Sequence, residues 1–130
     1  MAEPHRFAVR VYYEDTDFSG NVYHAQYLKF FERARTEWLR TAGVSHSLLA
    51  RDGLAFAVRS LQVEFVAPAH IDDALEVQTS VLELSGARLR LAQALFRGET
   101  LLTRAELQIA AIRADGRPTR LPQAVRAAFG

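Results

Sequence analysis

The sequence contains no cysteine, which excludes disulfides, thiolate metal sites and cysteine nucleophiles. It also lacks a long hydrophobic run, and its apolar stretches fall far short of the roughly 20 residues that span a bilayer. Neither sign of charge is in excess, because 16 basic residues face 15 acidic ones and leave a net charge of +1. That balance gives no electrostatic basis for general nucleic-acid binding. We therefore expect neither membrane insertion nor a nucleic-acid partner.

Several familiar site motifs are missing as well. No histidine is spaced with another histidine or a carboxylate as in a zinc site, so no metal is expected. No serine lies in a G-x-S-x-G context, and no glycine-rich phosphate-binding motif is present. The N-terminal segment is charged throughout and has no apolar core, which argues against a signal peptide and predicts a cytoplasmic protein.

The length of 130 residues predicts one domain that occupies the whole chain, residues 1–130. The first residues alternate between apolar and polar side chains, the pattern of a half-buried strand. The apolar side of this strand consists of Phe7, Val9, Val11 and Tyr13. A polar segment follows at residues 14–21, and its acidic, small and glycine residues predict a loop.

Between about His24 and Thr41 the apolar period becomes that of a helix. The side chains that recur at three- and four-residue spacing are Tyr27, Phe31, Ala34 and Trp38. Such a broad aromatic face predicts packing against a wide surface such as a sheet. A second, short helix is expected over residues 45–51.

Most of the remaining chain has the pattern of strands. Alternating segments at 54–66, 75–81, 89–95 and 101–113 are separated by turn residues. The first of them slips by one residue near Arg59 and Ser60, which predicts a β-bulge. A short helix over residues 121–129, with Pro122 in its first turn, completes the chain. A strand, a long helix and four hairpin-linked strands predict an α+β fold with one helix on one antiparallel sheet.

The densest polar cluster lies between the first strand and the long helix. A helix start offers free backbone N–H groups and the positive end of the helix dipole, which stabilise an anion such as the oxyanion of acyl transfer. Asp15 or Asp17, a few residues upstream, is placed to attack a carbonyl held there or to activate water against it. The alternative is that these carboxylates only cap the helix or order the loop.

The same region carries a family resemblance. The matching segments are Val11–Asp17, Gly20, Val22–Ala25, Tyr27 and Phe31–Arg35. They resemble the signature of the 4-hydroxybenzoyl-CoA thioesterase family, and more narrowly its bacterial branch encoded with the Tol-Pal envelope system. The resemblance implies the hotdog fold, in which a curved antiparallel sheet wraps around one long central helix. It also implies homodimers that often pair into tetramers, with active sites at the subunit boundary.

The resemblance also implies roles for individual residues. Asp17, the second aspartate of Asp-Thr-Asp, would be the nucleophile or general base of acyl-CoA hydrolysis. Gly20 and Val22 would lie against the coenzyme A thioester, and the backbone amides around Tyr23 and His24 would polarise its carbonyl. His24 would support proton transfer or buttress the loop.

No metal or redox cofactor is implied, because coenzyme A belongs to the substrate. Its phosphates suggest arginine contacts, for which Arg59, Arg88 and Arg90 are the candidates; solvated arginines on strand faces are the alternative. Asp15 is expected to hold the loop, while Phe18 and Asn21 depart from the family pattern and leave the acyl-chain preference open. Two other functions compete: a non-catalytic module that binds acyl-CoA or acyl carrier protein, and a hotdog hydratase or dehydratase.

Overall fold

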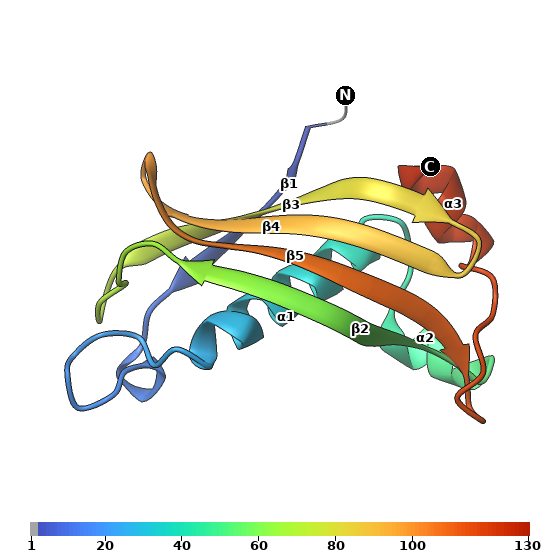
Figure 1. Cartoon of the computed structure of the whole chain (residues 1–130), viewed down its shortest axis with the longest axis horizontal. Helices are drawn as coiled ribbons and strands as arrows, with labels where there is room; N and C mark the ends of the chain where they lie inside the picture. The colour runs from blue at the N-terminus through green and yellow to red at the C-terminus, as the bar shows by residue number, and fades with distance from the viewer. Residues whose placement is uncertain (1–2) are drawn as a thin grey trace.

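The computed structural model describes residues 3–130 and contains a five-stranded antiparallel sheet with the strand order β1-β3-β4-β5-β2. The strands are β1 (His5–Arg10), β2 (Leu54–Phe65), β3 (Ala74–Ser85), β4 (Arg88–Arg97) and β5 (Thr100–Arg113). Helix α1 (Gln26–Arg40) lies across one face of this sheet (Figure 1). The α+β arrangement predicted from the sequence is confirmed, but the hairpin expected between β2 and β3 is wrong, because β2 pairs with β5 at the other margin of the sheet. No helix within residues 3–130 is long and apolar enough to cross a membrane.

Helix α1 packs through the face that its apolar period predicts. Its buried side chains are Tyr27, Phe30, Phe31, Ala34, Trp38 and Leu39. They join the inward-facing residues of the central strands, among them Leu75, Val77 and Leu91, in one core cluster. Burial of this aromatic stripe removes apolar surface from water and fixes the helix against the sheet.

Strand β2 contains the predicted irregularity. Its pairing with β5 shifts between Val58 and Ser60, so Arg59 is the extra residue of a bulge. The bulge restores the apolar side chains before and after it to the face that carries α1. Leu61 can therefore lie opposite Leu107, just as Val58 lies opposite Ile109.

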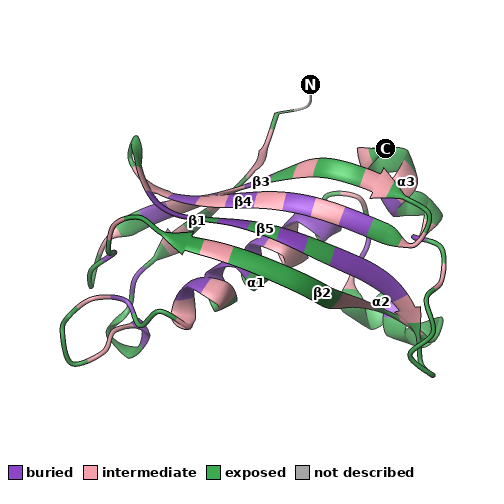
Figure 2. Cartoon of the chain, in the orientation of Figure 1, coloured by how far each residue is buried: buried purple, intermediate pink, exposed green. Residues whose placement is uncertain are grey.

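The outer edge of β2 is uncovered in this chain. Strand order places β2 at one margin of the sheet, and most of its length is exposed (Figure 2). Val58, Leu61 and Phe65 point to the helix side yet keep 48%, 39% and 50% of their surface in water. An apolar strip beside a free strand edge is a surface that another chain can cover.

The first strand ends earlier than the alternation predicts. Tyr13 was expected on its buried side, but it lies in a 3-10 turn (η1, Tyr13–Asp15) and is 82% exposed. That prediction is wrong because Asp15 draws the chain into a turn: its Oδ2 accepts the Tyr12 N–H at 2.8 Å. Beyond Arg10 the side chains still alternate between apolar and polar, but the backbone has left the strand. Val11 donates its N–H to the Asp73 carbonyl at 3.0 Å.

The two short helices are present. Helix α2 (His46–Arg51) begins after Ser45, whose hydroxyl accepts the Leu48 N–H. Helix α3 (Gln123–Phe129) starts later than the expected residue 121, because Pro122 occupies its N-cap and not its first turn. The ring of Phe129 stacks on Trp38 with centroids 4.2 Å apart, so the chain's end closes the core beside α1.

A buried polar network connects α1 to the sheet. The Gln93 side chain is 1% exposed and donates to the Phe31 carbonyl and to the Thr79 hydroxyl, both at 3.0 Å. Its Oε1 accepts from Arg35 at 3.0 Å. Burial lowers the pKa of Arg35, opposed by the negative charge of Glu32. Gln93 therefore provides hydrogen-bond partners for a helix carbonyl, a strand hydroxyl and the Arg35 guanidinium between the helix and the sheet.

We expect Gln93→Leu to lower the free energy of unfolding by about 2–3 kcal/mol, because it leaves buried polar groups without partners. Thr103→Val is the matched control: Thr103 is fully buried, and its hydroxyl has no hydrogen-bond partner within residues 3–130. Its replacement should be neutral or stabilising. Urea denaturation of both variants measures the difference. Equal effects would show that the network does not hold the helix to the sheet.

Candidate active site

The predicted site loop borders an open pocket of about 340 Å³. The pocket lies between the β1–α1 loop, the first turn of α1 and the segment that follows β2. Its polar wall consists of Asp17, Ser19, Asn21 and His24, and its apolar wall includes Val22, Tyr27 and Phe65. The first turn of α1 and the end of β2 meet this loop at one end of the molecule (Figure 1).

Asp15 holds the loop against the start of α1. Its side chain is 4% exposed, and its Oδ1 accepts from the Gln26 side-chain amide at 2.9 Å. Its backbone carbonyl accepts the Tyr23 N–H at 2.9 Å. The first aspartate of Asp-Thr-Asp thus has a structural role, as expected.

The connection between β2 and β3 supports the loop from the other side. The Val22 N–H donates to the Ala69 carbonyl at 2.8 Å, and the Ala69 N–H donates to the Tyr27 hydroxyl at 3.0 Å. Asp73 further fixes this connection, accepting from Arg97 at 2.9 Å. Both walls of the pocket are therefore tied together by hydrogen bonds.

Asp17 sits in a tight turn at the rim of the pocket. Its carbonyl accepts the Gly20 N–H at 3.1 Å, and Gly20 adopts φ +82°, a value that favours glycine. The N–H and hydroxyl of Ser19 both donate to the Asp17 Oδ1, at 2.8 and 2.5 Å. These bonds lower the pKa of Asp17, with a further contribution from the charge of His24. The carboxylate is consequently ionised, and its Oδ2 has no donor among the described residues.

His24 extends beside the mouth of the pocket. Its ring lies 4.6 Å from that of Tyr23 and meets Phe65 edge-on at 6.5 Å. The N–H groups of His24 and Ala25, just before α1, have no acceptor within residues 3–130. They are free to meet an acceptor brought by a ligand.

The predicted site residues are only partly brought together. Asp17, Val22 and His24 line the pocket, whereas Gly20 shapes the turn beside it. The Tyr23 N–H already donates to the Asp15 carbonyl. Of the two backbone amides expected to polarise the thioester, only that of His24 therefore lacks an acceptor within residues 3–130. Sequence reasoning missed Tyr27 as a pocket residue, because its helical spacing indicated only a core position.

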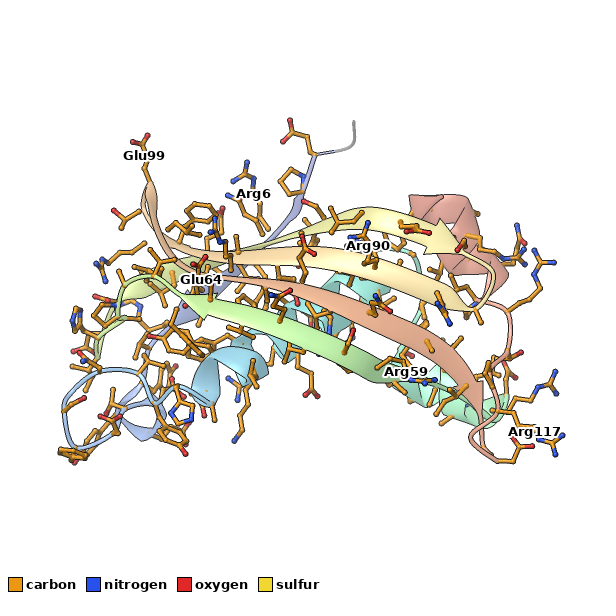
Figure 3. The ribbon with its side chains drawn as sticks, in the orientation of Figure 1. Arg6, Arg59, Glu64, Arg90, Glu99 and Arg117 are labelled. Atoms are coloured by element: carbon orange, nitrogen blue, oxygen red, sulfur yellow. The ribbon has the colours of Figure 1, made fainter. Side chains whose placement is uncertain are left out.

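The three candidate arginines do not line this pocket. Arg59 is the exposed bulge residue of β2. It lies toward the α2 end of this strand, whereas Glu64 lies toward the end that borders the pocket (Figure 3). Arg88 and Arg90 flank the inward-facing Leu89, which places them on the outer face of the sheet. Arg90 there approaches Glu83 and Glu106 at 3.6 and 3.8 Å.

The outer face also carries a larger hollow, of about 690 Å³, around Ala92 and Ala94. Two carboxylates line it, and each lies beside an arginine: Glu64 pairs with Arg104, and Glu106 approaches Arg90. Each of these carboxylates has an arginine counter-ion, whereas Asp17 forms no ion pair within residues 3–130, so size alone does not make this hollow the reaction site. No group of three or more His, Asp or Glu side chains in the described chain is placed to hold a metal ion.

Comparison with known proteins identifies the family: residues 11–129 match the thioesterase-like superfamily. The chain belongs to this superfamily. It is 46% identical over 125 residues to the acyl-CoA thioesterase YbgC of Haemophilus influenzae, an alignment that covers 95% of this chain and 92% of that protein. The resemblance found in the sequence is therefore confirmed.

Solved structures of thioesterases share the fold. A probable thioesterase from Bartonella henselae is 47% identical, with a TM-score of 0.88 over 92% of this chain and 99% of that chain. A 1,4-dihydroxy-2-naphthoyl-CoA thioesterase from Synechocystis is 28% identical, with a TM-score of 0.90 over 97% of this chain and 95% of that chain. The predicted hotdog fold is confirmed by these superfamily members.

Proposed function

We propose that this superfamily member hydrolyses acyl-CoA thioesters to a free carboxylic acid and coenzyme A, with Asp17 as the reacting carboxylate. The observation that carries the proposal is the Asp17 carboxylate at the rim of a pocket that His24 also lines. Within residues 3–130 this carboxylate bonds only to Ser19, and the His24 N–H has no acceptor. A fixed negative oxygen and a free donor are what addition to a carbonyl requires. The names of the YbgC relatives favour the same substrate class.

Asp17 can serve in either of two ways. As a general base it takes a proton from water, whose oxygen then adds to the thioester carbon. As a nucleophile its Oδ2 adds directly and forms an anhydride that water later cleaves. In both routes the carbonyl oxygen becomes negative, the carbon–sulfur bond breaks and the thiolate of coenzyme A leaves. The helix-start N–H groups stabilise the negative oxygen.

A second copy of the chain would complete the site. The uncovered apolar strip of β2, with Leu61 at its middle, supports pairing of two β2 edges around a two-fold axis. Antiparallel pairing would place the Leu54 end of one β2 beside the Phe65 end of the other, next to the Asp17 loop. Arg59 would then lie at the seam, available to a coenzyme A phosphate. Arg88 and Arg90 would contact the nucleotide part of coenzyme A only if that part crosses to the outer face of the sheet.

Release of free thiol tests the proposal against its alternatives. A hydrolase liberates coenzyme A from an acyl-CoA, whereas a binding module for acyl-CoA or acyl carrier protein leaves the thioester intact. A hydratase or dehydratase also leaves it intact while changing the acyl chain. Absence of thiol release with intact binding would contradict hydrolysis.

Ser19→Ala should shift the acid limb of the pH profile upward. Ser19 donates to the charged form of Asp17 and lowers its pKa, so removing the hydroxyl raises that pKa toward the ordinary aspartate value of about 3.9. The active, ionised form then persists over a narrower range at low pH. The measurement is kcat/KM between pH 3 and pH 7, and Ser47→Ala on α2 is the control. An unshifted acid limb would mean that Asp17 does not control it.

A further inference from the structure

The pocket is also lined by a residue with a buried hydroxyl, Tyr27. Tyr27, in the first turn of α1, is 4% exposed, and its side chain lines the same pocket as Asp17. Its ring meets Phe65 at 5.5 Å and Phe30 at 6.3 Å, both near edge-on. These contacts fix the ring, so the hydroxyl occupies one defined position in the wall.

The hydrogen bonding of Tyr27 leaves its own proton free. The hydroxyl oxygen accepts the Ala69 N–H at 3.0 Å, which uses one of its lone pairs. The O–H itself has no acceptor among residues 3–130. A buried phenol normally donates as well as accepts, so a missing acceptor points to one supplied by water or a ligand. Burial also raises the pKa of Tyr27, which keeps the proton on the oxygen at neutral pH.

Most other hydrogen-bond donors around the pocket already have acceptors. The N–H groups of Asp17, Val22 and Val66 donate to backbone carbonyls, and that of Ser19 donates to the Asp17 side chain. The donors that remain on the floor and rim are few. They are the His24 N–H, the His24 ring, the Asn21 side-chain amide and the Tyr27 hydroxyl.

Tyr27 differs from the others on that short list by its burial. The His24 ring and the Asn21 side-chain amide belong to an exposed and a half-exposed residue, so water competes for both, whereas Tyr27 is buried. A donor held rigidly away from water stabilises developing charge far better than a mobile, hydrated one. We propose that the Tyr27 hydroxyl donates its proton in a hydrogen bond to the thioester carbonyl oxygen and stabilises the oxyanion together with the His24 N–H.

This inference rests on the proposed acyl-CoA hydrolysis and adds a catalytic residue to it. The hydroxyl proton stays on Tyr27 throughout, and no bond to the phenol forms or breaks. The bond from Ala69 orients the oxygen, because one lone pair is fixed toward the β2–β3 connection. The O–H is left for an acceptor that the described residues do not supply.

The first test is Tyr27→Phe, which keeps the ring and removes only the hydroxyl. We expect kcat for acyl-CoA hydrolysis to fall about 100-fold, the loss typical of one oxyanion donor, with KM essentially unchanged. Tyr12→Phe is the matched control, because the Tyr12 ring is 62% exposed and lies outside the pocket. Asp17→Asn is measured beside both variants.

A second variant separates catalysis from structure. Replacement of Tyr27 by 3-fluorotyrosine keeps the shape but makes the phenol a stronger donor and a weaker acceptor. If the hydroxyl stabilises the oxyanion, this protein keeps or exceeds wild-type kcat. If the hydroxyl only anchors Ala69, both Tyr27 variants lose activity in step with their thermal stability, which overturns the inference.

The remaining outcomes are equally decisive. Wild-type kcat in Tyr27→Phe beside an inactive Asp17→Asn would overturn the role of Tyr27 and leave the proposed function intact. Wild-type kcat in both variants would overturn the site itself. Loss in Tyr27→Phe with activity retained by the fluorinated protein would support the assignment.

Discussion

Asp17→Asn is expected to lower kcat for acyl-CoA hydrolysis by at least about 100-fold, the low end of what a positioned acid–base group contributes. The amide is isosteric but cannot attack the thioester or take a proton from water. Among the described residues the Asp17 side chain hydrogen-bonds only with Ser19, inside its own turn, so the fold should be retained. Thiol release under saturating acyl-CoA measures the loss, and circular dichroism checks the fold.

Asp52→Asn is the control for this change, because Asp52 is an exposed residue in the turn after α2 and outside the pocket. It should turn over acyl-CoA at the wild-type rate. Near wild-type activity in Asp17→Asn would remove Asp17 from the reaction and leave the pocket without its reacting group. Equal losses in both variants would indicate a general charge effect in place of catalysis.

Leu61→Arg is expected to separate the proposed dimer and to lower kcat about 100-fold. Leu61 lies on the helix side of β2 and is 39% exposed in the single chain. Two guanidinium groups facing each other across a two-fold seam would be buried without partners, which is strongly unfavourable. The activity falls because the second copy no longer completes the site, and small misplacements of reacting groups cost factors of this size.

Light scattering coupled to gel filtration measures the mass of this variant, and the thiol assay measures its rate. Gln62→Arg is the matched control, since Gln62 is the next residue along β2 but faces the outer side of the sheet. A monomeric Leu61→Arg protein with full activity would show that one chain contains the whole site. A wild-type protein that is already monomeric would contradict the pairing of β2 edges.

The elements of the fold were predictable because local rules and packing agree in this chain. The aromatic period of α1, the turn residues between strands and the one-residue slip at Arg59 each have a counterpart in the structure. Tyr13 was misplaced because side-chain alternation continues after the backbone has left the sheet. The hydrogen bond from Tyr12 to Asp15, which turns the chain, has no signature in apolar periodicity.

The site was predictable in part, and for a physical reason. Asp17 and His24 are close in sequence and stand in one loop, so a local motif could identify both. The roles of Tyr23 and Tyr27 depend on contacts with Asp15 and Ala69, and the second of these is far away along the chain. Spacing shows that Tyr27 points inward but not what its hydroxyl meets. Contacts with a second copy lie outside what one chain determines.

Thiol release by the wild-type protein from a panel of acyl-CoAs is the most direct test of acyl-CoA hydrolysis in the Asp17 pocket. The panel should run from short to long aliphatic chains and include an aroyl-CoA, with the free acid quantified beside the thiol. We predict equal amounts of thiol and acid from at least one member, and none from it with Asp17→Asn. Intact thioesters across the whole panel, with acyl-CoA still bound, would contradict hydrolysis and favour a binding module.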